Sequence, residues 1–391
     1  MDNNWRDATK LVRGGTKRSP HGETSEALYL TSGFCYEDAE TAEARFAGES
    51  DGFVYGRYGN PTVEMFEERL RLLEGAQACY GTASGMAAVW GALSSHLEAG
   101  DHIIASKALF GSCYQIITNI LPRFGITSSL VDGTDLDAWR AAVTPQTRCF
   151  FLETPSNPTL EIIDIKAVAD IAHQSGSILV VDNVFATPIL QKPLAFGADI
   201  VVYSGTKHID GQGRVLGGAI LSSAQFKEDQ LKPMLRHTGP SLSPFNAWVM
   251  LKGLETLKLR VEAQSQSALD IATWLESTKG VSRVFYPGLA SHAQADLAQT
   301  QMSGGGTLIA LEIVGGKQAA FDLMARLKVI DISNNLGDSK SLITHPASTT
   351  HRAVGEQARA EMGISDGMLR LSVGLEDVRD LIEDLQQAII R

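Results

Sequence analysis

Short apolar runs alternate with stretches of helical periodicity through the first two thirds of this 391-residue chain. The candidate strands are residues 102–105, 147–152, 178–181, 200–203 and 218–221, and the helical patterns between them cover 87–97, 113–124 and 165–174. Strands that alternate with helices form a mostly parallel sheet with helices on both faces. We therefore predict an α/β fold that binds its ligand at the carboxyl ends of the strands.

The chain divides into three predicted segments. Residues 1–60 contain many turn formers and little core of their own, which indicates an arm that contributes to a neighbouring active site. Residues 61–255 hold the alternating pattern and form the large domain. Residues 256–391 are predicted to form a smaller α+β domain. The patterns nearest to and within that domain are a long helix over 245–279, strands over 281–286 and 307–314, and helices over 318–327 and 378–390.

Composition excludes several classes of protein. The formal net charge of −11 argues against a nucleic-acid binder, which needs a basic face. No apolar stretch approaches the length of a membrane span, and the first residues lack a secretory signal. The four cysteines are scattered and form no C-x-x-C pair. We expect a cytoplasmic enzyme that holds no metal and makes no contact with membranes.

A lysine follows one of the buried-looking strands. The run 200–203 leads directly into Ser204-Gly-Thr-Lys207, and lysine is rarely buried without a partner. A desolvated lysine loses its charge and becomes a nucleophilic amine that can form an imine. Asp182 ends the strand pattern 178–181, where a carboxylate can keep a pyridine nitrogen protonated. Each residue alone also fits a surface lysine or a capping aspartate, but together they predict a site for pyridoxal phosphate.

A cluster of small residues predicts the phosphate site of this cofactor. Gly81-Thr-Ala-Ser-Gly-Met86 lies at the start of a helical pattern, where backbone N–H groups and the helix dipole favour an anion. Ser204 and Thr206 add hydroxyl donors beside Lys207. By itself such a cluster is more often a tight turn, and neither of the common nucleotide-binding glycine motifs occurs here.

Four further residues are candidates for binding polar groups. Tyr55 and Arg57 can both bind phosphate, and Asn157, held between two prolines, can donate to a cofactor oxygen or a substrate carboxylate. Arg370 lies in an apolar strand pattern, so it needs an anion, either a substrate carboxylate or an internal acidic residue. The histidines have no metal-site spacing and are interpreted as structural; they include His208, His345 and His351.

These motifs occur in an order that resembles a known family. Tyr-Gly-Arg-Tyr-Gly-Asn-Pro-Thr, Ser-Gly-Met, Glu-Thr-Pro-Ser-Asn-Pro, Val-Asp-Asn, Ser-Gly-Thr-Lys and Arg-Leu-Ser-Val-Gly follow one another as in the Cys/Met-metabolism family of PLP enzymes. The similarity runs from about residue 10 to the C-terminus. It implies PLP fold type I, aspartate aminotransferase-like, and a homotetramer assembled as a dimer of dimers. A catalytically silent scaffold is disfavoured because Lys207, Asp182 and the phosphate cluster are all present.

By position, the resemblance implies a role for each candidate. Lys207 and Tyr55 are the catalytic groups, and Tyr55 and Arg57 come from the neighbouring subunit. The implied cofactor-binding residues are Tyr55, Arg57, Ser84, Gly85, Met86, Phe110, Asn157, Asp182, Ser204, Thr206 and Lys207. The implied substrate-binding residues are Arg370, Asn335 and Asn157.

Within the family, the sequence after Lys207 and Ser333-Asn-Asn-Leu-Gly-Asp338 are most similar to the O-succinylhomoserine sulfhydrylases. This implies a γ-replacement in methionine biosynthesis, with an acylated homoserine and sulfide or another thiol as small-molecule substrates. Phe110 stands where the family usually has a tyrosine, and Asn335 where lyases tend to have a serine. Cystathionine γ-synthase and O-acetylhomoserine sulfhydrylase remain alternatives. Methionine γ-lyase is disfavoured because those lyases tend to carry a reactive cysteine where this chain has Ser112, and Cys113 lies one place later.

Overall fold

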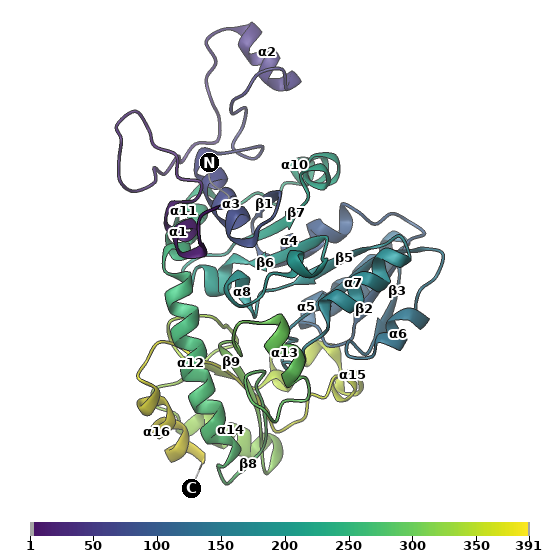
Figure 1. Ribbon diagram of the computed structural model, residues 1–391, viewed down its shortest axis with the longest axis vertical. Coiled ribbons are helices and arrows are strands. Elements are labelled where there is room, and N and C mark those ends of the chain that lie inside the picture. Colours follow the sequence, from purple (N-terminus) through teal and green to yellow (C-terminus); the bar gives the residue numbers. More distant parts are fainter. Residues whose placement is uncertain (1–3, 390–391) are drawn as a thin grey trace.

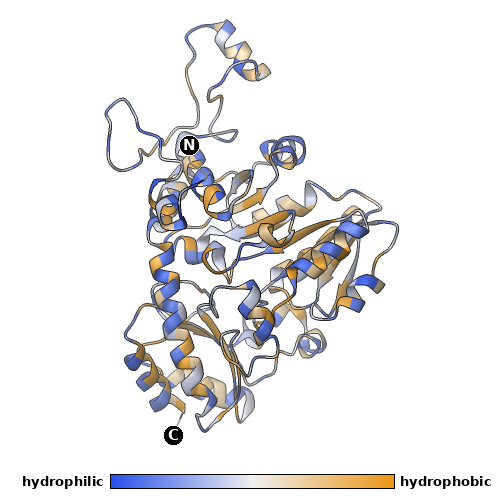
Figure 2. Cartoon of the chain, in the orientation of Figure 1, coloured by the Kyte–Doolittle hydropathy of each residue, from blue (hydrophilic) through white to orange (hydrophobic). Residues whose placement is uncertain are grey.

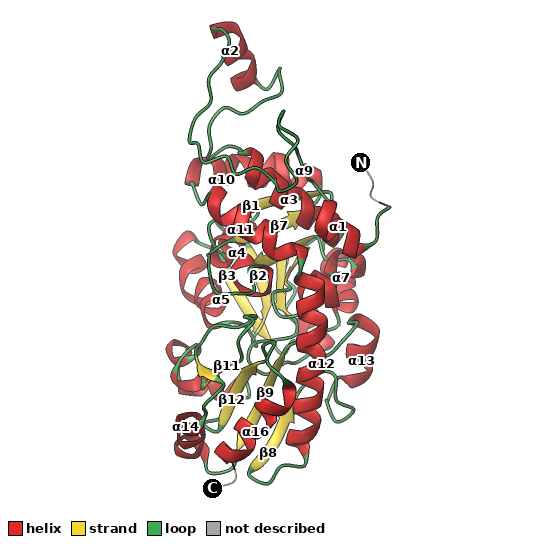
Figure 3. Cartoon of the chain, turned by 90° about the vertical axis from the view of Figure 1, so that its left-hand side faces the viewer, coloured by secondary structure: helices red, strands yellow, loops and turns green. Residues whose placement is uncertain are grey.

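Two β-sheets organise the chain in the computed structural model, which describes residues 4–389 (Figures 1 and 3). The first sheet has seven strands in the order β1-β7-β6-β5-β4-β2-β3, and the second has five in the order β10-β11-β12-β9-β8. The strands of the first sheet are β1 (Ala78–Thr82), β2 (His102–Ser106), β3 (Thr127–Val131), β4 (Thr147–Glu153), β5 (Ile178–Asp182), β6 (Ile200–Ser204) and β7 (Gly218–Ser222). Those of the second are β8 (Val281–Phe285), β9 (Leu308–Ile313), β10 (Asp331–Ile332), β11 (Leu342–Thr344) and β12 (Met368–Ser372).

The first sheet is mostly parallel, which confirms the predicted α/β class. Strands β6, β5, β4, β2 and β3 pair in parallel, and only β7 runs antiparallel to its two neighbours, β1 and β6. The sequence patterns located five of these strands and missed β1 and β3. β3 lies at the sheet edge with a partly exposed Thr-Ser-Ser start, and β1 contains Gly81, so neither has a continuous apolar β-branched run.

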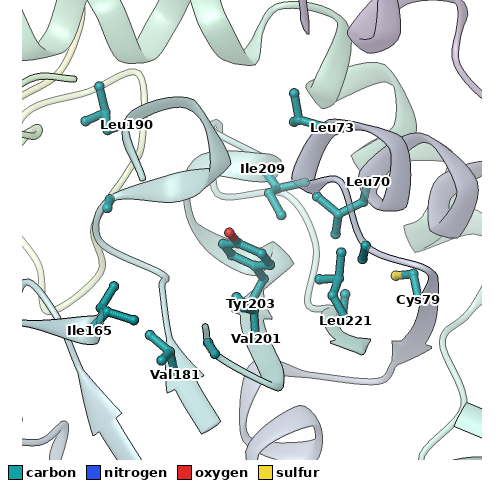
Figure 4. Packing of buried hydrophobic residues seen from close by; sticks show 14 of the residues in the cluster. Leu70, Leu73, Cys79, Ile165, Val181, Leu190, Val201, Tyr203, Ile209 and Leu221 are labelled. Carbon is teal, nitrogen blue, oxygen red and sulfur yellow. The ribbon is translucent and has the colours of Figure 1, made fainter. Parts of the chain in front are cut away.

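Helices cover both faces of the first sheet because its central strands are apolar on both sides. Phe150 and Leu152 of β4 belong to one buried cluster, whereas Phe151 between them belongs to another. Figure 4 shows part of the first cluster, where Tyr203 and Val201 of β6 lie near Leu70 and Leu73. In Figure 2 the strands are mainly apolar and the helices have mixed polarity. The strands, and with them their carboxyl ends, are thus fixed in place by buried clusters on both faces of the sheet.

The helices expected over 87–97 and 165–174 are present, the expectations over 113–124 and 245–279 need correction, and the sequence patterns missed the helices at 136–141, 187–190 and 224–238. The bounds are α3 (Pro61–Glu74), α4 (Gly85–Ser94), α5 (Gly111–Gln115), η1 (Ile116–Ile120), η2 (Leu121–Phe124), α6 (Leu136–Ala141), α7 (Ile165–Gln174), α8 (Thr187–Leu190), η3 (Pro193–Phe196), α9 (Ala224–Phe226), η5 (Lys227–Leu231), α10 (Lys232–Thr238) and α11 (Pro244–Glu255). The helix expected over 113–124 changes to a π turn and then a 3₁₀ turn, since Pro122 has no N–H to donate. The single helix expected over 245–279 is wrong: Thr256, at φ −110° and ψ 4°, separates α11 from α12 (Leu257–Glu276).

The second sheet lies beside the first, and one long helix packs against both parts of the molecule. Helix α12 runs along both parts in Figure 1, and with α14 (Gly316–Arg326) and α16 (Val378–Ile389) it covers one face of the second sheet. On the opposite face, Leu308 and Ala310 of β9 pack against Leu160 and Phe185, which follow β4 and β5. The second sheet is therefore held against the strand ends of the first. The remaining helices in this part are α13 (Ala295–Gln301), η6 (Pro346–Ser348), η7 (Arg352–Val354) and α15 (Glu356–Glu361).

The N-terminal segment has two kinds of environment. In α1 (Asp7–Arg13), Leu11 is buried in the first core, and Lys192 pairs with Asp7. In α2 (Ala39–Ala47) no residue is buried, and this helix projects from the body in both ribbon views. The proposed divisions at residues 60 and 255 remain predictions. Among residues 4–389, no helix is long and apolar enough to cross a membrane.

Candidate active site

A pocket of about 290 Å³ opens at the carboxyl ends of the first sheet's strands. It brings together ten of the predicted site residues, namely Ser84, Gly85, Met86, Phe110, Asn157, Asp182, Ser204, Thr206, Lys207 and Arg370. A larger cavity of about 770 Å³ contains neither Lys207 nor Arg370. Because the nucleophile and the buried cation both line the smaller pocket, we assign the chemistry to it.

Lys207 lies in the π turn η4 (Gly205–Ile209), directly after β6. Its backbone leaves the helical region at φ −91° and ψ −125°, and its Nζ donates to Asn335 Oδ1 at 2.6 Å. Burial, assisted by the positive charge of Arg370, lowers the pKa of Lys207 to about 8. A much larger fraction of this amine is uncharged near neutral pH than for an ordinary lysine, as a nucleophile or base requires.

Asp182 ends β5 and faces the same pocket. Its Oδ1 accepts from the backbone N–H of Val184 at 3.1 Å, and burial raises its pKa to about 7. A buried carboxylate gains from a cationic partner, and the protonated ring nitrogen of pyridoxal phosphate is such a partner.

The small residues at the start of α4 permit a close approach of two backbone segments. The hydroxyl of Ser84 caps the helix by accepting from Ala87 N at 3.1 Å. A Cβ atom on Gly85 would lie 2.5 Å from the Cβ of Ser204, so no larger residue fits there. This contact places the N-terminus of a ten-residue helix beside the hydroxyls of Ser204 and Thr206. Such a set of donors suits a phosphate group.

Arg370 is a buried cation that has no anionic partner in residues 4–389. The side chain lies within β12 and is 2% exposed. Its Nη1 donates to Asn157 Oδ1 at 2.9 Å and its Nη2 to the carbonyl of Asn334 at 2.9 Å, whereas its Nε has no hydrogen-bond partner. The internal ion pair that the sequence left open is therefore not formed. A buried guanidinium with an unused donor is suited to a ligand carboxylate.

Three predicted residues do not line this pocket. Asn335 reaches the pocket by accepting hydrogen bonds from two of its residues, at Oδ1 from Lys207 Nζ and at the backbone carbonyl from Arg370 Nη2, whereas Asn334 and Leu336 form the wall itself. Tyr55 is 44% exposed, and Arg57 donates to the Arg236 carbonyl and lines the larger cavity. A single chain therefore does not bring Tyr55 or Arg57 to Lys207.

The pocket also contains a residue that the sequence interpretation missed. Glu153 is the last residue of β4 and lies in register with Asp182 of the neighbouring strand. Its signal was available, since an acidic residue ends an apolar run one strand away from Asp182.

The three histidines considered earlier are buried and hydrogen-bonded to Thr307, the Asp366 carbonyl and the Leu109 carbonyl respectively. In the described part of the chain, no group of three His, Cys, Asp or Glu side chains is arranged to hold a metal.

The residues present fit pyridoxal phosphate. The pocket offers an amine for its aldehyde, a carboxylate for its ring nitrogen, helix N–H groups and hydroxyls for its phosphate, and the Phe110 ring for its apolar face.

Comparison with curated proteins shows close relatives. The O-succinylhomoserine sulfhydrylase of Mycobacterium tuberculosis (strain ATCC 25618 / H37Rv) is 55% identical over 386 residues, which cover 98% of this chain and 95% of that protein. The O-succinylhomoserine sulfhydrylase of Pseudomonas aeruginosa is 48% identical over 382 residues, covering 97% of this chain and 94% of that protein.

Solved structures share the whole fold. A putative O-acetylhomoserine (thiol)-lyase from Campylobacter jejuni matches with a TM-score of 0.95 at 33% identity, covering 99% of this chain and 100% of that one, and carries N'-pyridoxyl-lysine-5'-monophosphate. The metB structure from Corynebacterium glutamicum matches with a TM-score of 0.93 at 33% identity, covering 100% and 99%. These matches confirm PLP fold type I.

The family model for the Cys/Met metabolism PLP-dependent enzymes matches residues 8–390. Together with the relatives and the pocket, this match confirms the predicted family and cofactor. The chain therefore belongs to the Cys/Met metabolism PLP-dependent enzymes, and its cofactor is pyridoxal phosphate.

Proposed function

We propose that this enzyme converts O-succinylhomoserine and sulfide into homocysteine and succinate, as a step in methionine biosynthesis. In this γ-replacement the bond between Cγ and the succinyl oxygen breaks and a bond between Cγ and sulfur forms. The two sulfhydrylase relatives at 55% and 48% identity support this choice, as do the sequence motifs after Lys207.

The observation that carries the proposal is the buried guanidinium of Arg370, which forms no ion pair within residues 4–389 and lies in the pocket that contains Lys207. An amino-acid substrate presents an α-carboxylate, and pairing it with Arg370 would direct the adjacent amine and Cα toward the rest of the pocket. Asn157, which already accepts from Arg370, holds the guanidinium in this orientation.

The chain's own groups account for the proton transfers. When bound, pyridoxal phosphate supplies an aldehyde that captures the substrate amine and a ring that accepts electrons from Cα. Lys207, with a pKa of about 8, is suited to take the Cα proton and to move protons at Cα and Cβ. Asn335 accepts from Lys207 Nζ and so orients the amine.

We also propose that the active unit is a dimer within a homotetramer. Tyr55 and Arg57 lie outside the pocket of their own chain, and the projecting segment around α2 exposes Leu30 and Phe46. Both facts fit an arm that delivers Tyr55 and Arg57 to a neighbouring subunit, where Tyr55 would act near the leaving group. The cytoplasm remains the proposed compartment, in agreement with four free cysteines.

Three other activities are kept as alternatives. Cystathionine γ-synthase would use cysteine as the thiol, and O-acetylhomoserine sulfhydrylase would use the acetyl ester. A methionine γ-lyase would release methanethiol from methionine; the L-methionine gamma-lyase of Porphyromonas gingivalis is 41% identical to this chain. A preference between two such substrates can rest on one or two contacts, which together change selectivity by about 1–3 kcal/mol.

One assay separates these activities. The purified holoenzyme is incubated with O-succinylhomoserine or O-acetylhomoserine, each with sulfide or cysteine, and separately with methionine. We expect homocysteine to form fastest from O-succinylhomoserine and sulfide. Cystathionine as the main product, a preference for the acetyl ester, or methanethiol from methionine would each replace the proposed activity by one alternative.

A further inference from the structure

Glu153 is a buried carboxyl that the proposed mechanism does not use. Its side chain lines the pocket and is only 3% exposed. The residue ends β4 in register with Asp182, the end of β5, so two acidic residues line one pocket from paired positions of neighbouring strands. Two carboxylates this close in a buried site cannot both keep their charge without a cation between them.

Glu153 has no such cation within ion-pair distance in residues 4–389. Arg370 attracts Glu153 through space only, because its two Nη atoms donate to Asn157 and Asn334. The titratable or charged side chains on the elements around Glu153 are Asp182 (β5), His102 (β2), Cys113 and Tyr114 (α5), Tyr203 (β6), Lys207 (η4), Arg370 (β12) and His351, whose ring bonds to the Leu109 carbonyl. Burial and then the charge of Asp182 raise the pKa of Glu153 well above its ordinary range.

Among the described residues, the side chain of Glu153 makes one hydrogen bond, to the backbone at the start of a helix. Its Oε2 accepts from the backbone N–H of Phe110 at 2.7 Å. Phe110 is the residue before α5, and its own side chain cannot cap the helix. The carboxyl of Glu153, at the end of β4, instead accepts from the backbone N–H at this helix terminus. An acid and an amide of the same shape can both accept this bond, so the contact does not require a negative charge.

We propose that Glu153 is a neutral carboxylic acid in the assembled site, a positioning residue that holds Phe110 and leaves Asp182 and Arg370 free for cofactor and substrate. An ionised Glu153 would repel Asp182 and would compete with a substrate carboxylate for Arg370. With its proton in place, Asp182 is the one carboxylate beside the ring nitrogen, and Arg370 keeps its charge for the ligand. The proposal rests on the role given to Arg370 under the proposed function and on the assignment of Asp182 to the ring nitrogen of the cofactor.

The decisive measurement is infrared spectroscopy of the holoenzyme. A protonated carboxylic acid has a carbonyl stretching band that a carboxylate lacks. We expect the wild-type minus Glu153→Gln difference spectrum at neutral pH to contain this band. Glu153→Ala provides a second route to the same spectrum if Glu153→Gln does not fold. A difference spectrum with carboxylate bands and no acid band overturns the proposal.

Binding measurements test the positioning role separately. Glu153→Gln keeps both shape and acceptor, so the dissociation constant for pyridoxal phosphate and the KM for the acylated homoserine should each change by less than about threefold. Glu153→Ala leaves the Phe110 N–H unpaired and should weaken cofactor binding by about tenfold or more. A change of about tenfold or more in Glu153→Gln means that the charge matters and contradicts the proposal.

The matched control is Glu161→Gln, because Glu161 follows the same strand but does not line the pocket. For Glu161→Gln, the dissociation constant for pyridoxal phosphate and the KM for the acylated homoserine should equal those of the wild type. The infrared band does not depend on which ester or thiol reacts. A protein that shows the band but makes no homocysteine therefore contradicts only the proposed function, and an active sulfhydrylase without the band contradicts only this inference.

Discussion

The two walls of the pocket are built in different ways. The first sheet contributes Asp182, Ser204 and Lys207, which stand at or just beyond strand ends. The second sheet contributes Arg370, which lies inside β12 and is surrounded on both sides by buried apolar residues. The first wall holds groups suited to the cofactor, and the second holds a cation suited to the substrate. The comparison indicates that cofactor binding and substrate binding can be disturbed separately.

Replacement of Lys207 should have the largest effect, since it removes the base from the first wall. We expect Lys207→Ala to lower kcat with O-succinylhomoserine and sulfide by about 10⁴-fold, the upper end of what a positioned acid or base contributes. Cofactor should still bind, detected by its absorbance after gel filtration, because Asp182 and the phosphate cluster remain. A Lys207→Ala enzyme that turns over at the wild-type rate would contradict the assignment.

Replacement of Arg370 tests the second wall alone. Arg370→Ala removes the partner of the substrate carboxylate, and kcat/KM for the acylated homoserine should fall about 100-fold. The dissociation constant for pyridoxal phosphate should remain near that of the wild type. Arg370→Lys, which retains the charge without the planar fork, should recover part of the loss. Equal losses in cofactor and substrate binding would show that the two walls are not independent.

A glycine substitution tests the phosphate side of the first wall. A Cβ at position 85 would collide with Ser204, so Gly85→Ala should force the two segments apart. We expect cofactor affinity to fall about tenfold, as typical overpacking costs imply, with KM for the substrate little changed in the saturated enzyme. Gly304→Ala is the control, because its new Cβ would meet only ordinary contacts. Fluorescence titration with pyridoxal phosphate gives both affinities.

The smallest effect concerns pH and the cofactor-free protein. Burial lowers the pKa of Lys207 from 10.5 to about 8, so between these values the unfolded chain binds more protons than the folded one. The free energy of unfolding of the wild type, minus that of Lys207→Met, should therefore rise with pH through this window. At about pH 9 this difference should be about 1 kcal/mol larger than it is well below pH 8. Urea unfolding of both proteins at several pH values measures the difference. A difference that stays constant or falls would mean that Lys207 is not desolvated.

Much of the first wall was predictable because local patterns mark it. Asp182 and Lys207 each follow an apolar run, and parallel strands bring their carboxyl ends to one edge. β3 escaped prediction because an edge strand needs no continuous apolar run. The division of the expected 245–279 helix was also missed, since Thr256 departs from helical geometry although the helical pattern continues on both sides of it.

The sequence by itself determined the α/β alternation, the strand-end lysine and aspartate, and the family. Those features follow from residue periodicity and from motifs within a few neighbouring residues. Only the tertiary structure decided that Arg370 pairs with no acidic side chain in the described part of the chain, that Asn335 reaches Lys207, and that Glu153 stands beside Asp182. The physical reason is that partnership between buried charges depends on strand register and on the packing of one sheet against the other, and neither is recorded in local sequence pattern.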